Sequence, residues 1–360
     1  MLFKKIQEGQ IKLYVPVVDL PEHGRKHGFY NPVMELDRDI SVAAISVFKN
    51  MFEEKFGKQP NCCDLLCATG IRGLRYAKEI CIDEVILNDV NEEAIKLTKR
   101  NIKLNKLSNV FLHNKDANHL LAENRFDVID VDPFGSPYRF IDSCARSLNR
   151  FSLFCVTATD CAVLFGVYPD VCKRRYGVEG LRCHFSNEFG VRVLISFLMR
   201  EFAKYNKCFT PVLSYTRRHY VRVFGIVEND AGKTDKILNE FDYLSYKDGV
   251  WKKGIETSWK IHSKIYFGSL HKKEFCNKVI EEIKNRKLSG IKILNTITDE
   301  IDEPFYYDLN WLAKTYKKQI QPKNKIIEKL KQNSFKASQT IFCSTGIKTD
   351  AGLEQIAKLI

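Results

Sequence analysis

The sequence has no C-x-x-C pair, no apolar run long enough to cross a membrane and no recognisable secretory leader. Its twelve cysteines are scattered along 360 residues. The one local group, Cys62, Cys63 and Cys67, has a spacing that suits a tetrahedral zinc site poorly. We therefore expect reduced cysteines with structural roles in an intracellular chain. Lys4 and Lys5 stand where a signal peptide would need its apolar core, so secretion is not expected.

The most membrane-like stretch runs from Phe151 to Tyr168. It is interrupted by Thr157, Thr159 and Asp160, and it is shorter than the ~20 apolar residues that a membrane-spanning helix needs. A strand followed by a helix is the better interpretation. We expect a soluble, cytoplasmic protein.

Positive charge is in excess, with 57 Lys and Arg against 44 Asp and Glu and a net charge of +13. Such an excess favours a polyanionic partner, although a lysine-rich solvated surface would look the same. The lysines are clustered: residues 313–336 hold eight lysines and one glutamate, with Tyr316 and Phe335 among them. This clustering favours nucleic acid as the partner.

Strand-like and helix-like segments alternate from about residue 60, which is typical of a parallel α/β sheet. The predicted strands are 62–66, 84–87, 110–113, 126–131 and 152–157, and the predicted helices include 91–105 and 187–205. Two adjacent strands follow, 211–216 and 220–227, with Arg217, Arg218 and His219 at the turn. A late antiparallel pair at the edge of a parallel sheet distinguishes class I methyltransferases from dinucleotide-binding folds.

The length exceeds what a single core usually supports, so two domains are expected. The composition turns polar and the alternation stops near residues 229–233. We place the boundary there, with a domain at 1–228 and a smaller, Lys-rich α+β domain at 229–360 that would contact the nucleic acid. Residues 1–40 resemble an N-terminal extension rather than a strand–helix unit.

Residues 132–137, Asp-Pro-Phe-Gly-Ser-Pro, directly follow the buried strand 126–131. An acid, a proline and an aromatic at the carboxyl end of a strand indicate methyl transfer to a nitrogen conjugated with a ring or an amide. Such a nitrogen is a poor nucleophile because its lone pair is delocalised. Asp132 and the Asp132 and Pro133 carbonyls would orient its N–H groups, and Phe134 would stack on the planar group.

Three further strand ends carry residues suited to binding S-adenosylmethionine. Gly70 lies in a glycine-containing turn that lets a ligand approach the backbone. Asp89 would accept hydrogen bonds from both ribose hydroxyls, and Asp116 with the Ala117 N–H would bind the adenine. A helix N-cap is the alternative role for both Asp89 and Asp116. A nicotinamide enzyme would not need the Asp-Pro-Phe-Gly sequence, so the combination favours S-adenosylmethionine over NAD.

Arg38 and Arg72 are both candidates for binding the methionine carboxylate, since a guanidinium pairs with a carboxylate through two hydrogen bonds. The alternative for both arginines is a surface ion pair with Glu35, Asp37 or Asp39.

The chain resembles the archaeal-type tRNA (guanine-N2)-dimethyltransferases over nearly its whole length. The matching segments are 29–32 with 38–39, 68–73, 88–89, 116–118, 132–137, 157–160, 304–308 and 345–350. Enzymes of this family transfer methyl groups from S-adenosylmethionine to a guanine at the junction of the D-stem and the anticodon stem of tRNA. The resemblance implies a class I (Rossmann-like) methyltransferase domain and a tRNA partner.

The resemblance also implies roles for individual residues. Asp132 would be the catalytic carboxylate, with Phe29 and Phe134 on either side of the guanine. The cofactor would be bound by Arg38, Arg72, Asp89, Asp116 and Ala117.

The chain departs from the family pattern at two places. Asp37 stands where the family usually has asparagine. Residues 243–263 contain no cysteine, whereas many relatives have a cysteine-rich zinc site early in the second domain, so no metal is expected.

Two other classes of function stay open. One is an amino-methyltransferase acting on DNA adenine or a protein glutamine, and the other is a non-catalytic tRNA-binding protein on the same scaffold. No obligatory protein partner is evident.

Overall fold

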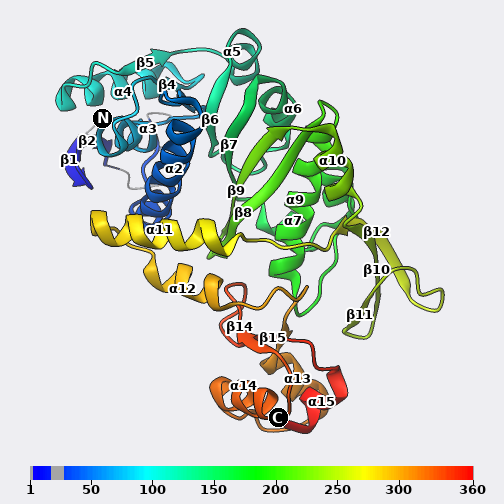
Figure 1. Cartoon of the computed structure of the whole chain (residues 1–360). Helices are drawn as coiled ribbons and strands as arrows, with labels where there is room; N and C mark the ends of the chain where they lie inside the picture. The colour runs from blue at the N-terminus through cyan, green and yellow to red at the C-terminus, as the bar shows by residue number, and fades with distance from the viewer. Residues whose placement is uncertain (1–2, 18–27, 360) are drawn as a thin grey trace. The chain divides into compact units, whose positions relative to one another are not determined.

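A seven-stranded sheet is the main feature of the computed structural model, which describes residues 3–17 and 28–359 (Figure 1). Its strand order is β5-β4-β3-β6-β7-β9-β8. The strands are β3 Cys62–Asp64, β4 Val85–Asn88, β5 Val110–His113, β6 Phe126–Val131, β7 Leu148–Ala158, β8 Lys207–Arg217 and β9 Tyr220–Asn229. The first five run parallel. Only two residues join β8 to β9, so these two run antiparallel.

The sequence located these strands closely. Strands β5 and β6 have the predicted bounds, and β7 begins four residues earlier than predicted, at Leu148. All six residues of β6, FDVIDV, are buried, including Asp127 and Asp130, as expected for a strand covered on both faces. The predicted late hairpin is present as β8 and β9.

The chain divides into two compact units, and the division passes through β9. The first unit comprises residues up to 157 together with 224–229 and 277–291, and the second comprises 158–223, 230–276 and 292–360. Segment 277–291 belongs to the first unit through side-chain contacts with helix α2: Ser46 donates to Glu282, and Asp39 accepts from the Ser289 N–H. The predicted domain boundary at 229 coincides with the end of the seven-stranded sheet, while the compact units interleave along the chain.

The first unit packs helices and a small hairpin around the parallel strands. Its helices are α2 Glu35–Phe56, α3 Ile71–Arg75, α4 Glu92–Asn105, α5 Ala117–Glu123 and α6 Tyr138–Ser147, with a 3-10 turn η1 Pro32–Met34 and a π-helical turn η2 Tyr76–Ile80. Helix α2 buries most of its first half, including three charged residues. These buried charges are paired with others, as buried charges must be.

The N-terminal segment differs from the predicted extension. Strands β1 Phe3–Glu8 and β2 Ile11–Pro16 form an antiparallel hairpin. The side chain of Asn101 accepts from the Tyr14 N–H, and that of Asn105 accepts from the Lys12 N–H. The hairpin therefore completes its edge by hydrogen bonding to helix α4, in which Asn101 is fully buried.

In addition to strand β8, the second unit contains helices and two three-stranded sheets. Its helices are α7 Cys161–Leu164, α8 Pro169–Tyr176, α9 Ser186–Ala203, α10 Ala231–Leu238, α12 Ile291–Asp299, α13 Leu309–Tyr316, α14 Lys323–Gln332 and α15 Leu353–Leu359, and α11 Lys273–Arg286 begins in it. The small sheets consist of β10 Phe241–Lys247, β11 Val250–Lys253 and β12 Lys260–Tyr266, and of β13 Tyr307–Asp308, β14 Ala337–Gln339 and β15 Gly346–Thr349. Leu309, Leu312, Ile326, Leu330 and Ile347 form a common core under α13 and α14.

Among residues 3–17 and 28–359, no helix is both long and apolar enough to cross a membrane. Stretch 151–168 forms most of β7, then α7, so it is a strand followed by a helix as predicted.

Candidate functional site

The glycine turn after β3 is held by its own backbone and by helix α4. Gly70 has φ +80° and caps α3, and a Cβ added there would lie 2.8 Å from a methyl carbon of Thr98. Glycine is therefore required both by conformation and by space. The Thr98 hydroxyl donates to the Ala68 carbonyl at 2.8 Å. The turn at the carboxyl end of β3 is thus held in one conformation before any ligand binds.

Asp89 joins the end of β4 to this turn. Its Oδ2 accepts from the Ala68 N–H and its Oδ1 accepts from the Asn91 N–H, both at 2.9 Å. The N-cap of α4 is Asn91, whose side chain accepts from the Glu93 N–H. The N-cap alternative considered for Asp89 is therefore wrong, because Asn91 occupies that position.

Asp116 does cap a helix. Its Oδ1 accepts from the Asn118 and His119 N–H groups at 2.9 and 3.2 Å, and Ala117 is the first residue of α5. This capping role was one of the two left open by the sequence. Both hydrogen bonds end on the same carboxylate oxygen.

Arg72 is buried and contacts several carboxylates. It is 4% exposed. Its Nε and Nη2 lie 2.8 and 2.7 Å from Oδ2 of Asp132, and its Nη2 lies 2.5 Å from Oδ2 of Asp37. Its Nη1 donates to the Ser41 hydroxyl at 3.2 Å and lies 3.9 Å from the Asp130 carboxylate. Burial lowers the pKa of Arg72, but the charges of Asp132, Asp37 and Asp130 outweigh it and hold the pKa well above its ordinary value.

Asp132 is anchored through one oxygen only. Both nitrogens of Arg72 that contact its carboxylate end on Oδ2, and the side chain is 26% exposed. Oδ1 takes no part in this ion pair, so it can accept a hydrogen bond from a bound group.

Arg38 is paired, but with a residue that the sequence did not suggest. Glu8 in strand β1 accepts from Arg38 Nε and Nη2 at 2.6 and 2.5 Å, and the Tyr30 hydroxyl donates to the same carboxylate at 2.9 Å. Burial opposes ionisation of Glu8, yet the hydrogen bonds and charge of Arg38 lower its pKa. The expected surface pair with Glu35, Asp37 or Asp39 is wrong, since Arg38 is only 4% exposed and bonded to Glu8.

Phe29 and Phe134, which the resemblance placed on either side of the guanine, lie in direct contact with each other. Their ring centroids are 4.9 Å apart and the planes meet at 83°. Phe134 is 56% exposed, and it stands in the turn after β6, in which Gly135 has φ +87° with no heavy atom within 4 Å of an added Cβ. A base stacked between two rings needs them roughly parallel and about 7 Å apart, twice an ordinary contact distance. The pair is therefore closed in this structure.

A second carboxylate pair lies beneath the site. Asp64 and Asp130 are register partners on the parallel strands β3 and β6 and are fully buried. Asp64 Oδ2 accepts from the Gly73 N–H at 3.0 Å, and the Tyr76 hydroxyl donates to Asp130 at 2.6 Å. Burial, followed by repulsion from Asp130, raises the pKa of Asp64 to about 7. Neither acid was predicted to be a site residue. Asp64 could have been found, because it is an aspartate at the end of an otherwise apolar strand.

The predicted site residues thus come together in the first unit. Residues from the ends of β3, β4, β5 and β6 lie at one edge of the sheet. No group of three or more His, Cys, Asp or Glu residues in 3–17 and 28–359 has the geometry to hold a metal ion. The expectation of no zinc stays a prediction.

The model of the N2,N2-dimethylguanosine tRNA methyltransferase family matches residues 9–360. The chain belongs to this family. It is 37% identical, over 99% of its length and 98% of the relative's, to a tRNA (guanine(26)-N(2))-dimethyltransferase of Methanococcus maripaludis strain C7. A relative with the same name from Methanosphaera stadtmanae is 34% identical over 99% of this chain and 96% of its own length.

A solved structure gives the same result. Trm1 from Pyrococcus horikoshii in complex with S-adenosyl-L-methionine superposes with a TM-score of 0.90 at 33% identity, covering 99% of each chain. The predicted family and the predicted class I methyltransferase fold are confirmed. Strand order β5-β4-β3-β6-β7-β9-β8 agrees with that fold.

Proposed function

We propose that the protein transfers one or two methyl groups from S-adenosylmethionine to the exocyclic N2 of guanine 26 in tRNA. Family membership over almost the whole chain carries the reaction type, the tRNA substrate and the cofactor, as the sequence predicted. The structural observation that supports the chemistry is Asp132, held by Arg72 through one oxygen beside the aromatic pair Phe29 and Phe134.

The residues at the strand ends fit the cofactor. Gly70 leaves a space in the turn that a Cβ atom would fill, and the Ala68 N–H fixes Asp89 beside this turn. Asp116 and the Ala117 N–H would bind the adenine at the end of β5, and Asp89 the ribose. When bound, S-adenosylmethionine supplies an electrophilic methyl group on a positively charged sulfur, and carboxylates nearby favour that charge.

Arg38 and Arg72 are already paired with carboxylates. We propose that each can still reach the methionine carboxylate, because a guanidinium has five N–H donors. The ion pairs with Glu8, Asp37 and Asp132 fix where these donors point.

Asp132 has a positioning and electronic role in this proposal. Its Oδ1 accepts a hydrogen bond from the guanine amino group, which turns the nitrogen lone pair out of conjugation and toward the methyl group. Arg72 keeps Oδ2 occupied, so the carboxylate cannot rotate away. Most of the acceleration then comes from orientation of the two reacting groups.

Phe29 and Phe134 would stack on the two faces of the guanine once the base is extruded. Extrusion costs roughly a few kcal/mol, and stacking on aromatic rings returns ~1–3 kcal/mol per base. Since the rings meet edge to face at 4.9 Å, they must separate before the base can enter. The exposed position of Phe134 makes it the ring that moves.

The tRNA body would lie on exposed basic residues. Arg218 and His219 at the β8–β9 turn are exposed, as are six of the eight lysines of residues 313–336. Arg222 of the same hairpin is fully buried, so it is excluded from any tRNA contact. Successive side chains of a strand point to opposite faces, so the Arg222 side chain lies on the face of β9 opposite to Val221 and Val223. The protein would act in the cytoplasm, where its substrate is.

A single assay tests the proposal and its rivals. The protein is incubated with labelled S-adenosylmethionine and a tRNA transcript, and the digested nucleosides are analysed for N2-methylguanosine and N2,N2-dimethylguanosine. Parallel incubations contain DNA or protein in place of tRNA. Label in DNA adenine or in protein glutamine would support another amino-methyltransferase, and no label in any substrate would support a binding protein. Asp132→Ala should abolish transfer, and near-normal transfer by that variant with S-adenosylmethionine bound would exclude the role given to Asp132.

A further inference from the structure

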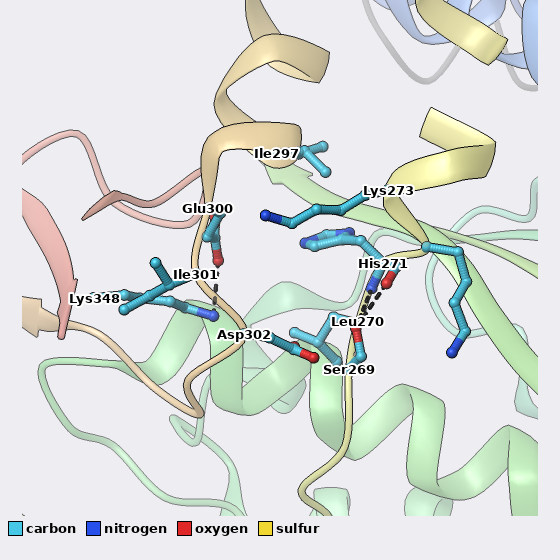
Figure 2. Close-up of a pocket in the computed structure, with 10 residues that line it drawn as sticks. Ser269, Leu270, His271, Lys273, Ile297, Glu300, Ile301, Asp302 and Lys348 are labelled. Carbon is cyan, nitrogen blue, oxygen red and sulfur yellow. Dashed lines mark hydrogen bonds and ion pairs between the residues drawn. The ribbon is translucent and has the colours of Figure 1, made fainter. Parts of the chain in front are cut away.

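The second unit contains a pocket remote in sequence from the methyl-transfer residues. Its volume is about 260 Å³, and it lies between the segments 269–273 and 297–302, with Lys348 of β15 as a further wall (Figure 2). Sites for whole small-molecule ligands typically measure about 300–1,000 Å³. This pocket is therefore of a size for part of a larger ligand.

His271 presents a hydrogen-bond donor to this pocket that has no acceptor. Its Nδ1 accepts from the Ser214 N–H at 3.3 Å, so the proton of the neutral ring must be on Nε2. Nε2 is buried and has no partner in the part of the chain that the structure describes. Burial, then the charges of Lys348, Arg192 and Lys273, lower the pKa of His271 well below 6.5. The ring is thus neutral, and its N–H lacks an acceptor.

Lys273 adds a positive charge beside this donor. Its side chain runs along the His271 ring toward Glu300 (Figure 2). It is also the first residue of the fourteen-residue helix α11, so the positive end of that helix dipole points toward the same space. Both features favour an anion that accepts hydrogen bonds.

The other charges of the pocket are largely used within the protein. Lys348 is 3% exposed and pairs with Glu300 Oε1 at 2.7 Å and Glu188 Oε1 at 3.3 Å. Glu300 Oε2 accepts from the Ile341 N–H at 2.9 Å. Asp302 is exposed, where solvent screens its charge. Lys273, His271 and the exposed Lys272 therefore remain as donors for a ligand. Of the two lysines, Lys273 is the one whose charge acts on His271.

We propose that this pocket binds one phosphate group of the tRNA backbone, with His271 Nε2–H and the Lys273 ammonium donating to its oxygens. The inference rests on the proposed function for the identity of the RNA. Leaving a buried donor without an acceptor destabilises the free protein, and a phosphate oxygen removes that penalty only in the complex. The pocket thus fixes one point of the tRNA backbone.

The test compares tRNA affinity of full-length variants over a range of KCl concentrations. Lys273→Gln should weaken binding about tenfold, the loss of one charge-assisted hydrogen bond. It should also reduce the slope of log K against log salt by about 0.7–0.9, the effect of one phosphate contact. Lys284→Gln is the matched control, since Lys284 is exposed on the same helix and outside the pocket. Equal effects of the two substitutions, or an unchanged slope for Lys273→Gln, would overturn the proposal.

His271→Gln provides a second, independent measurement. Because His271 is neutral, its loss should weaken tRNA binding while leaving the salt slope at the wild-type value. Thermal unfolding with inorganic phosphate, at constant ionic strength, separates the two possible sources of the anion. If phosphate stabilised the wild type but not Lys273→Gln, and tRNA affinity were unaffected by the substitution, a free phosphate compound would replace tRNA as the ligand.

Methyl transfer at saturating tRNA separates failure of this proposal from failure of the proposed function. Lys273→Gln should then turn over at the wild-type rate, because the residue contacts neither the cofactor nor the guanine. A wild-type protein that methylates no tRNA would refute the proposed function. The pocket would still be judged on binding alone.

Discussion

The substitution Asp64→Asn tests whether burial holds a proton on the carboxyl group of Asp64. Asp64 is 1% exposed and is paired in register with the buried Asp130. Its pKa is raised from 3.8 to about 7, by burial first and by Asp130 second. In the unfolded chain the same carboxyl returns to its ordinary pKa. Between about pH 4 and pH 7 the native state therefore binds more protons than the unfolded state, and the free energy of unfolding falls as pH rises.

The size of this effect follows from the shift. A difference of about three pKa units corresponds to about 4 kcal/mol at 1.36 kcal/mol per unit. Asparagine carries no charge at any of these pH values. Its Oδ1 can still accept from the Gly73 N–H, as Asp64 does at 3.0 Å, and its amide can donate to Asp130. Asp64→Asn should therefore lose the pH dependence and exceed the wild type in stability above pH 7.

The assay is urea unfolding of wild type and Asp64→Asn at pH 5 and pH 8. The difference in the free energy of unfolding between the two proteins should change by about 2.5 kcal/mol between these pH values, in favour of the variant at pH 8. Asp83→Asn is the control, since Asp83 is exposed. If the Asp64→Asn difference stayed constant within ~0.5 kcal/mol, the reasoning that burial holds a proton on Asp64 would be refuted.

Three further substitutions test other parts of the site. Glu8→Gln should lower stability at pH 7 by about 3–5 kcal/mol, because it leaves the buried Arg38 without its anionic partner; chemical unfolding measures this, and an effect below 1 kcal/mol would contradict it. Phe134→Leu should raise KM for tRNA or lower kcat about tenfold, the value of one stacked base, with S-adenosylmethionine affinity unchanged by calorimetry; equal loss of cofactor binding would mean a structural role. Gly70→Ala should weaken cofactor binding at least tenfold, since an added Cβ would meet Thr98 at 2.8 Å in a left-handed conformation; normal affinity would show that the turn can relax.

Local patterns sufficed for the central sheet but not for the residues around it. Strands β3, β4 and β5 were predictable because each is a short apolar run ending in a polar residue, and β5 and β6 have the predicted bounds. The hairpin β1–β2 was missed, since its alternation is weak and its partner residues Asn101 and Asn105 lie about ninety positions away. Long-range hydrogen bonds of that kind leave no periodic signal in a single sequence.

The same limit applies to the site. Spacing and the family resemblance placed Arg38 and Arg72 near the cofactor, but neither indicated Glu8 as the partner of Arg38. A helix N-cap was the alternative role for two acids at strand ends. Asp116 caps a helix, whereas Asp89 does not. The closed contact of Phe29 and Phe134 depends on ring orientations that no sequence pattern encodes.

The charges around Arg72 connect the fold to the chemistry. Arg72 lies within 4 Å of carboxylate oxygens of Asp37, Asp130 and Asp132, so these four side chains together carry a charge of −2 when all three acids are ionised. Asp64 would add to this excess, and its raised pKa limits that addition near neutral pH. A net negative, partly buried cluster favours a cation more strongly than a neutral group. These carboxylates would therefore attract S-adenosylmethionine, whose sulfur is positively charged, more than the uncharged thioether that remains after methyl transfer, and so favour exchange of product for fresh cofactor before a second methylation.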